Sequence, residues 1–233
     1  MIFAAILAGG IGNRIGSNKP KQFLMVGNKP ILIYSVKQFL KVDEIDKIIV
    51  SSPKDYIGTT KKLIRDYFVD DEKIIVIAGG KTRNDTILNS IAFVKDNYDE
   101  GDHILITHDA ARIFVTPEII KDSIVKLENH DAASAIMPAV DVIFEKDNQS
   151  NLIDIPLREN LVHAQTPQSF KINKFLEIYN DLTDDEIKIL DEAMILFHLR
   201  NANIVLFNGN SINFKITRPI DLKIARELLN NKI

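Results

Sequence analysis

The sequence FAAILAGGIGNRIG at residues 3–16 joins a short apolar run directly to a glycine-rich stretch. The apolar run predicts a buried strand, and the glycines predict a loop whose backbone adopts positive φ and approaches a ligand closely. Free N–H groups in such a loop form a concave site for anions. Arg14, Lys19 and Lys21 lie in or just after this stretch, so it predicts a site for a ligand that carries several phosphate charges.

Two common glycine-rich motifs do not fit this stretch. Gly10, Gly12 and Gly16 are spaced as G-x-G-x-x-x-G, one residue longer than the dinucleotide-binding fingerprint. The apolar run at residues 47–52 also ends without the acidic residue that would bind a ribose. The complete P-loop pattern G-x-x-x-x-G-K-[ST] is absent from the chain. An ordinary strand-to-helix turn with solvated cations is the alternative interpretation.

Composition narrows the class of protein. With 233 residues, 45% of them hydrophobic, the chain can bury a substantial core, and we expect a single domain over residues 1–233. A net charge of −3 argues against a nucleic-acid partner. The absence of cysteine excludes disulfides and thiolate nucleophiles and favours the cytoplasm. Because no segment approaches the roughly 20 apolar residues of a membrane span, we expect a soluble protein without a membrane partner.

Apolar runs alternate with helical patterns along most of the chain. The predicted strands cover residues 3–7, 47–51, 73–77, 103–107, 132–137 and 203–207. The predicted helices cover residues 30–42, 53–68, 82–97, 117–129, 173–180, 184–200 and 219–229. This alternation, with strands apolar on both faces, predicts a three-layer α/β/α, Rossmann-like fold around a mainly parallel sheet.

The alternation breaks at residues 138–170, which we interpret as a protruding β-arm. Residues 140–145 and 152–155 predict a hairpin across the polar turn at 146–151, and residues 161–165 predict an extended segment. An excursion of about 30 residues without helix usually covers a site or pairs subunits. A lone hairpin is marginally stable in water, and a second copy of the same arm is the simplest cover, so the arm predicts a two-fold homodimer.

Ligands of parallel sheets bind beyond the carboxyl ends of the strands, and this rule selects candidate site residues. The two glycine pairs, Gly9-Gly10 and Gly79-Gly80, follow two of these strands and predict two places where the backbone meets a ligand, one for phosphates and one for a base. Asp109 follows another strand and is a natural Mg²⁺ ligand, because Mg²⁺ prefers one or two carboxylates together with phosphate oxygens.

Each of these side chains also has a simpler interpretation. Asp109 could cap the turn that follows its strand. Arg83 could be a solvated first-turn arginine, and Lys215 could be a surface lysine. His108 and His163 are interpreted as packed residues rather than bases, because no nucleophilic partner is apparent beside them in the sequence.

Taken together, several short motifs resemble the cytidylyltransferases that act on polyol phosphates. The resemblance covers essentially the whole chain in order. It is carried by Ala8-Gly9-Gly10 with Arg14, Pro20-Lys21-Gln22, Gly80 with Arg83, His108-Asp109-Ala110-Ala111-Arg112, Gln165-Thr166-Pro167-Gln168 and Lys215-Ile216-Thr217-Arg218-Pro219. It implies a fold of the nucleotide-diphospho-sugar transferase type and transfer of CMP from CTP to a sugar-alcohol phosphate, with release of pyrophosphate.

The resemblance also implies roles for individual residues. Arg14 and Lys21 would stabilise the pentacoordinate phosphorus, while Arg158 and Lys215 would position the attacking phosphate. The implied CTP-binding residues are Leu7, Ala8, Gly9, Gly10, Gly80, Lys81, Arg83, Thr86 and Ala110. The implied acceptor-binding residues are Asp109, Arg112, Asp141 and Thr166. Asp109 would also bind Mg²⁺, and Arg158 on the arm would reach into the neighbouring subunit of a homodimer.

The chain departs from the family pattern at a few positions, and its acceptor stays open. Lys81 replaces a small or acidic residue, Val142 a threonine of the arm, Ile113 a proline and Thr86 a serine. Residues 154–158 and 165–170 resemble the ribitol-phosphate branch, which serves teichoic acid or capsule synthesis, whereas Ala110 and residues 191–193 resemble the methylerythritol-phosphate branch of isoprenoid synthesis.

We favour ribitol 5-phosphate as the acceptor and keep methylerythritol 4-phosphate as the alternative. A CTP-binding regulator without catalysis is the rival from another class. The cations Arg14, Lys21, Arg158 and Lys215 argue against it, because a sensor needs no positive charge directed at a second phosphate.

Overall fold

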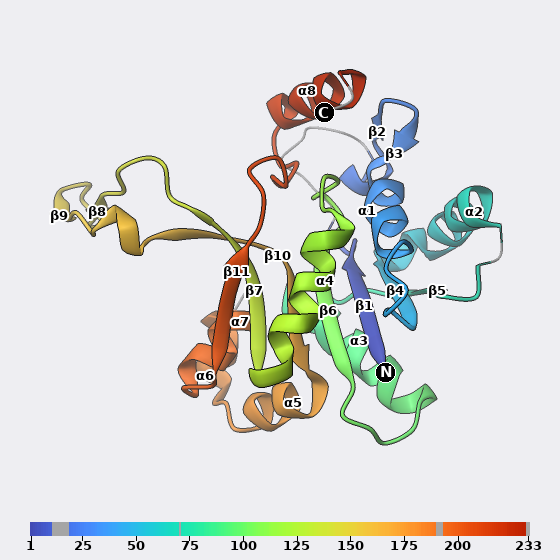
Figure 1. Ribbon diagram of the computed structural model, residues 1–233, viewed down its shortest axis with the longest axis horizontal. Coiled ribbons are helices and arrows are strands. Elements are labelled where there is room, and N and C mark those ends of the chain that lie inside the picture. The colour runs from blue at the N-terminus through green and yellow to red at the C-terminus, as the bar shows by residue number, and fades with distance from the viewer. Residues whose placement is uncertain (11–18, 70, 190–192, 232–233) are drawn as a thin grey trace.

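A seven-stranded sheet forms the centre of the computed structural model, which describes residues 1–10, 19–69, 71–189 and 193–231 (Figure 1). Its strands are β1 (Ile2–Leu7), β4 (Lys47–Ser52), β5 (Ile74–Ala78), β6 (Ile104–Asp109), β7 (Ala132–Pro138), β10 (Val162–Lys171) and β11 (Ile204–Asn208). They lie in the order β11-β7-β10-β6-β1-β4-β5. Only β10 is antiparallel to its neighbours in this sheet, so the prediction of a mainly parallel sheet is confirmed.

Helices cover both faces of the sheet, which confirms the three-layer prediction. They are α1 (Ile31–Phe39), α2 (Ile57–Phe68), α3 (Arg83–Asn97), α4 (Pro117–Lys126), α5 (Ile172–Asn180), α6 (Asp184–Ile189), α7 (Ala193–Leu199) and α8 (Pro219–Asn230). Alternate side chains of β1 enter the two cores: Ala4 and Ile6 pack on the side of α1, α2 and α4, whereas Phe3 and Ala5 pack on the side of α3, α5 and α7. Burial on both faces explains the continuous apolar run of β1.

Most predicted elements agree with the structure to within a few residues. The helix expected from residue 53 instead begins with a 3-10 turn at Lys54–Tyr56, before α2. The helix expected over residues 184–200 is present as two helices, α6 and α7, and residues 190–192 between them lie outside the described part of the chain. None of the described helices is long and apolar enough to cross a bilayer.

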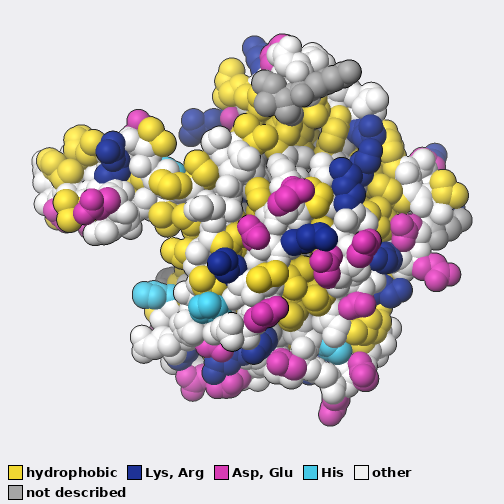
Figure 2. Space-filling model, viewed as in Figure 1, with side chains coloured by type: hydrophobic (Ala, Val, Ile, Leu, Met, Phe, Trp, Pro, Cys, Tyr) yellow, Lys and Arg dark blue, Asp and Glu magenta, His cyan; other side chains and the backbone are white. Residues whose placement is uncertain are grey.

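The arm projects sideways from the sheet, at the left of Figure 1. Its hairpin is shorter than predicted, because only β8 (Glu145–Lys146) and β9 (Leu152–Asp154) pair with each other. A shift of register within β8 limits the ladder, and the Asp147 carboxylate closes the turn by accepting from the N–H groups of Gln149 and Asn151. The arm exposes a run of large apolar side chains, visible in Figure 2: Val140, Val142, Phe144, Leu152, Ile153, Ile155 and Leu157.

Candidate active site

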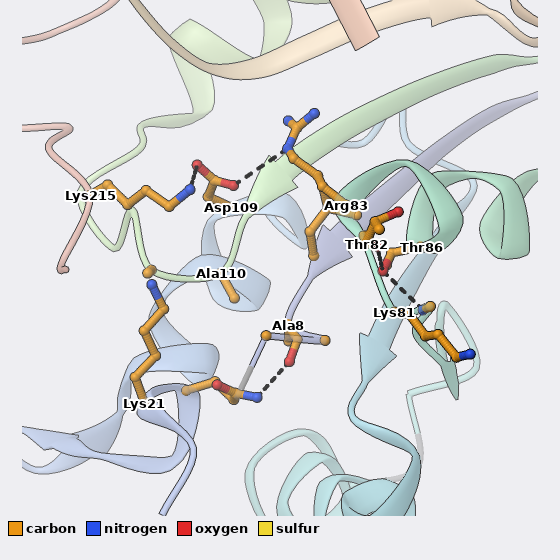
Figure 3. Close-up of a pocket in the computed structure, with 15 residues that line it drawn as sticks. Ala8, Lys21, Lys81, Thr82, Arg83, Thr86, Asp109, Ala110 and Lys215 are labelled. Atoms are coloured by element: carbon orange, nitrogen blue, oxygen red, sulfur yellow. Dashed lines mark hydrogen bonds and ion pairs between the residues drawn. The ribbon is translucent and has the colours of Figure 1, made fainter. Parts of the chain in front are cut away.

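A pocket opens at the carboxyl ends of β1, β5 and β6, where the parallel sheet was expected to bind its ligand (Figure 3). All nine residues predicted to bind CTP line it, together with Lys21, Asp109 and Lys215. Gln22, Thr82 and Ala111 also line the pocket. The glycine-rich backbone therefore lies next to three lysines, one arginine and one acidic side chain, and the cations suit a ligand that carries several phosphate charges.

Two glycine loops meet at one side of the pocket. The loop after β1 and the loop after β5 approach so closely that a Cβ on Gly79 would lie 3.2 Å from the Cα of Gly9. Thr86 fixes the second loop, because its hydroxyl accepts from the N–H of Gly80 (3.0 Å) and donates to the carbonyl of Thr82 (2.8 Å). Thr82 in turn begins α3 in a capping box with Asp85. The loop after β5 is thus held by the first turn of α3.

Gln22 is a pocket residue that the sequence reasoning did not assign to the site. It is buried in the short 3-10 helix Lys21–Phe23, and its amide nitrogen donates to the carbonyl of Ala8 at the end of β1 (2.5 Å). This bond fixes the segment that carries Lys21 against the loop after β1. Lys21 itself donates to the carbonyl of Ile216 (3.2 Å). In the sequence, the motif Pro20-Lys21-Gln22 was the feature that could have indicated Gln22 as a site residue.

The Asp109 carboxylate, at the end of β6, is the centre of the charge cluster. Its Oδ2 lies 3.0 Å from Lys215 Nζ and 3.2 Å from Arg112 Nε, and its Oδ1 lies 4.0 Å from Arg83 Nε. Burial by itself would raise the pKa of the Asp109 carboxyl, but the charges of Lys215, Arg83 and Arg112 outweigh burial and hold this pKa below its ordinary value. One anion among three cations leaves net positive charge beside the pocket.

These contacts decide between the two interpretations of the site residues. Arg83 and Lys215 are not free surface cations, because both lie against the Asp109 carboxylate with side chains only 16% and 35% exposed. Arg83 also donates to the Gln168 side chain (3.1 Å). The Asp109 side chain binds cations, and the turn after β6 is closed instead by a backbone bond from Arg112 N–H to the Asp109 carbonyl (3.0 Å).

His108 is a packed residue, as the sequence interpretation held. It is fully buried, and burial lowers its pKa to about 4, so its ring is neutral near pH 7. Nε2 lies 3.1 Å from the Arg112 carbonyl, which can only accept, so Nε2 carries the proton and Nδ1 accepts from the Thr166 hydroxyl (3.0 Å). The Thr166 oxygen then accepts from the N–H of Asp109 (3.1 Å). His108 therefore fixes the Thr166 hydroxyl, which binds the backbone of Asp109, rather than acting as a base.

Four of the predicted residues that the structure describes do not line this pocket: Arg112, Thr166, Asp141 and Arg158. Arg112 and Thr166 each form a hydrogen bond with Asp109, which does line the pocket. Asp141 and Arg158 lie on the arm, where both are exposed and Arg158 donates to the Val140 carbonyl (3.2 Å). Arg14 lies outside the described residues.

The donor set fits a magnesium ion that arrives with phosphates better than one held by protein alone. Among the described residues, no group of three or more His, Asp or Glu side chains could hold a metal. Asp109 is the one carboxylate in the described lining of the pocket. Two cations share its Oδ2, whereas the described part of the chain places the more distant Arg83 at its Oδ1, so Oδ1 is the oxygen that better suits Mg²⁺.

Comparisons with known proteins agree with this geometry. A family model described as IspD, 2-C-methyl-D-erythritol 4-phosphate cytidylyltransferase, matches residues 2–231. A ribitol-5-phosphate cytidylyltransferase from Lactiplantibacillus plantarum is 38% identical over 234 residues, covering 100% of both chains.

Solved structures show the same fold. A 4-diphosphocytidyl-2C-methyl-D-erythritol synthase from Anaerococcus prevotii is 23% identical, with a TM-score of 0.83 over 99% of this chain and 96% of that one. A 2-C-methyl-D-erythritol 4-phosphate cytidylyltransferase from Thermus thermophilus is 22% identical, with a TM-score of 0.74 over 97% and 98% of the two chains.

The three-layer fold, the glycine loops and the cation cluster define a nucleotidyltransferase. With the family model and the relative matched along its whole length, the chain belongs to the IspD family of cytidylyltransferases, and it is a CTP-using enzyme. The resemblance stated from the sequence is confirmed.

Gly80 offers a test of the prediction that the loop after β5 binds CTP. A Cβ at this position would overlap Asp85 and lie 2.8 Å from the backbone nitrogen of Thr86, so Gly80→Ala must displace the loop and break its bond to Thr86. Overpacking of this kind costs about 1–3 kcal/mol, so we expect CTP to bind about tenfold more weakly or worse in calorimetric titration. Gly58→Ala, at a position with open space around it in α2, is the control. Equal CTP affinity in the two variants would contradict the assignment.

Proposed function

We propose that this protein transfers CMP from CTP to D-ribitol 5-phosphate, forming CDP-ribitol and pyrophosphate, and that the product serves teichoic acid or capsule synthesis. The observation that carries the choice of acceptor is the 38% identity with a ribitol-5-phosphate cytidylyltransferase over the whole of both chains. The solved methylerythritol-phosphate enzymes named above are 22% and 23% identical. Methylerythritol 4-phosphate is the second candidate, because the matching family model carries that description.

In the proposed reaction, an oxygen of the acceptor phosphate attacks the α-phosphorus of CTP, and the bond from that phosphorus to the bridging oxygen of the β-phosphate breaks. The glycine loop after β1 and Lys21 bind the triphosphate, and the loop from Gly80 to Thr86 binds the base. Lys21 and Arg14 stabilise the charge that develops at the α-phosphorus, while Lys215 orients the acceptor phosphate. The protein acts by positioning and by neutralising charge, which is what this type of transfer needs.

Magnesium fits this scheme as a partner of the triphosphate. We propose that Asp109 Oδ1 holds Mg²⁺ on the protein side, with phosphate oxygens and water as the other ligands. The ion, when bound, would neutralise charge on the phosphates. Arg112, Thr166 and Asp141 are proposed to contact the acceptor.

The arm supports a homodimer in which subunits share sites. Its apolar side chains are exposed, with Val140 at 74% and Leu157 at 67%, and a second arm would cover them. Arg158 lies on this arm and not in its own pocket. We therefore propose that Arg158 of the partner subunit completes each site by binding the acceptor phosphate, and that residues 1–233 act as one catalytic domain with the arm at about 138–170.

The rival function, a regulator that binds CTP without turnover, is less well supported. Lys215 lines the pocket, and its ammonium group is directed at the Asp109 carboxylate (Figure 3). A binding protein for CTP alone would gain nothing from a cation placed for a second phosphate.

The proposed function is tested by pyrophosphate release with CTP, UTP and ATP against ribitol 5-phosphate, pentulose phosphates and methylerythritol 4-phosphate. We expect CTP with ribitol 5-phosphate to give the highest kcat/KM, because a site that hydrogen-bonds one base edge leaves buried groups unpaired with another. Comparable kcat/KM for UTP would refute the base preference. A higher value for methylerythritol 4-phosphate would overturn the choice of acceptor, and no release with any acceptor would favour the regulator.

Lys21 tests the assignment of charge stabilisation. If its ammonium acts on charge that develops at the α-phosphate, Lys21→Ala should lower kcat by about 10²-fold or more, the usual effect of losing one such group. Lys37→Ala, at an exposed position of α1, serves as the control. An effect confined to the KM for CTP would instead assign Lys21 to uniform binding of the substrate.

Mixing two inactive variants tests the shared site. Arg158→Ala and Lys215→Ala proteins should each lose activity, and after subunit exchange the mixed dimer contains one site with both residues intact. Since half of the dimers are mixed and one of their two sites is complete, we expect about a quarter of the wild-type activity to return. If the subunits exchange, as shown by native mass spectrometry, and activity stays absent, Arg158 does not act across the dimer.

A further inference from the structure

The segment that carries Lys215 has no helix or strand of its own. It runs from the end of β11 to the start of α8, and backbone bonds fix it at two places: Gly209 N–H donates to the Ile136 carbonyl (2.8 Å), and Ile216 N–H donates to the Ala111 carbonyl (2.9 Å). Between these bonds, Asn213 N–H donates to the Asn210 carbonyl (3.0 Å) within the segment itself, so the contacts that hold this part against the rest of the protein involve side chains. The side-chain contacts of this segment therefore help to hold the Lys215 ammonium 3.0 Å from the Asp109 carboxylate.

Asn213 binds this segment to β10 through its side-chain amide. Its side chain is fully buried, and its amide nitrogen donates to the Thr166 carbonyl (2.9 Å) and to Gln165 Oε1 (3.2 Å). The reverse orientation of this amide would place an oxygen against two acceptors, so the contacts fix it. The backbone carbonyl of Asn213 also accepts from Arg112 Nη1 (2.9 Å), and Arg112 binds the Asp109 carboxylate.

Gln165, on β10, binds the same segment. Its side chain is 6% exposed, and its amide forms two hydrogen bonds to the backbone of Asn210. Nε2 donates to the Asn210 carbonyl (2.9 Å), and Oε1 accepts from the Asn210 N–H (3.3 Å). The space is closed, because a Cβ on Gly209 would overlap Gln165 Oε1. One side chain therefore forms a pair of bonds to the Asn210 backbone and a third bond to Asn213.

An irregularity in β10 turns Gln165 and Thr166 toward the site. β10 pairs regularly with β7 up to Ala164 and again from Gln168, with a shift of register between them. Residues 165–167 therefore leave the ladder. Thr166 holds the backbone N–H of Asp109, while Gln165 and the Thr166 carbonyl hold Asn213. One bulge thus contacts both sides of the Asp109–Lys215 ion pair.

We propose that Gln165 and Asn213 are positioning residues that fix Lys215 relative to Asp109. Neither residue lines the described pocket, and both act through neutral amide bonds. The inference rests on the proposed function, in which Lys215 binds the acceptor phosphate. Loss of these bonds alone would displace one charge of the site without changing their number, so the test includes a variant that adds no charge.

The test is a double-mutant cycle between Asn213→Asp and Lys215→Ala, followed at high enzyme concentration so that the residual kcat/KM of the Lys215→Ala protein is measured. Asn213→Asp is nearly isosteric, loses both amide donations and places a carboxylate against two acceptor oxygens. We expect kcat/KM for the acceptor to fall at least tenfold, because displacement of a positioning group by about 1 Å can cost 10²-fold. The KM for CTP should stay within about twofold of the wild-type value. Asn208→Asp, the same change at an exposed position of β11, is the control and should match the wild type.

The cycle separates positioning from general damage. If Asn213 acts through Lys215, Asn213→Asp adds nothing in the Lys215→Ala background, whereas independent effects would multiply and refute the inference. Gln165→Met, which loses the donation to Asn210 and adds no charge, should repeat the pattern and so separates the lost bonds from the charge that Asn213→Asp adds. It also carries the test if Asn213→Asp unfolds at a lower temperature. Loss of the fold in both variants would assign the amides to stability and overturn the proposal.

The same measurements distinguish this inference from the proposed function. Full activity of Lys215→Ala would remove the proposed role of Lys215. An inactive Lys215→Ala protein together with an Asn213→Asp protein that matches the Asn208→Asp control would leave the function standing and reject the positioning role.

Discussion

The buried carboxylate of Asp109 is the constraint on which the site depends. It gathers Arg83 from the start of α3, Arg112 from the turn after β6 and Lys215 from the segment after β11. Without an anion between them, these cations would repel one another, and a buried charge left without its partner is strongly destabilising. With it, they form one cluster that still carries net positive charge. A phosphate that enters beside Lys215 therefore meets cations already held in place, without the cost of ordering them on binding.

Sheet topology explains why the arm and the charge cluster meet. β10 is antiparallel to β6 and β7, so the end of β10 nearest the arm lies at the carboxyl edge where the parallel strands deliver their site residues. A parallel strand in that place would have brought the chain in from the opposite edge. The bulge at residues 165–167 then turns side chains of the arm's base toward Asp109 and Asn213, and the arm beyond it leaves the body of the protein (Figure 1).

The sequence was sufficient to predict the fold class and to identify residues at the strand ends that line the pocket. The positions of Gly80 and Asp109 in the pocket lining could be predicted because the carboxyl-edge rule needs only to know where strands end, and apolar runs reveal this. Gln22, Gln165 and Asn213 could not be assigned in this way, since each acts through bonds to backbone carbonyls that depend on a bulge or a 3-10 turn. The arm hairpin was predicted too long, because alternating apolar residues suggest a strand even where no partner strand lies alongside.

Neutral side chains are the appropriate means of support around such a cluster. A charged residue in place of Gln165 or Asn213 would change the balance of charge around Asp109 and would itself need a partner in a buried region. An amide supplies both a donor and an acceptor and fixes direction without adding charge. Gln22 does the same for the segment that carries Lys21, by its bond to the Ala8 carbonyl. The cations that the phosphates would meet are thus held partly by amides that lie behind them, and this division keeps the net positive charge directed at the pocket.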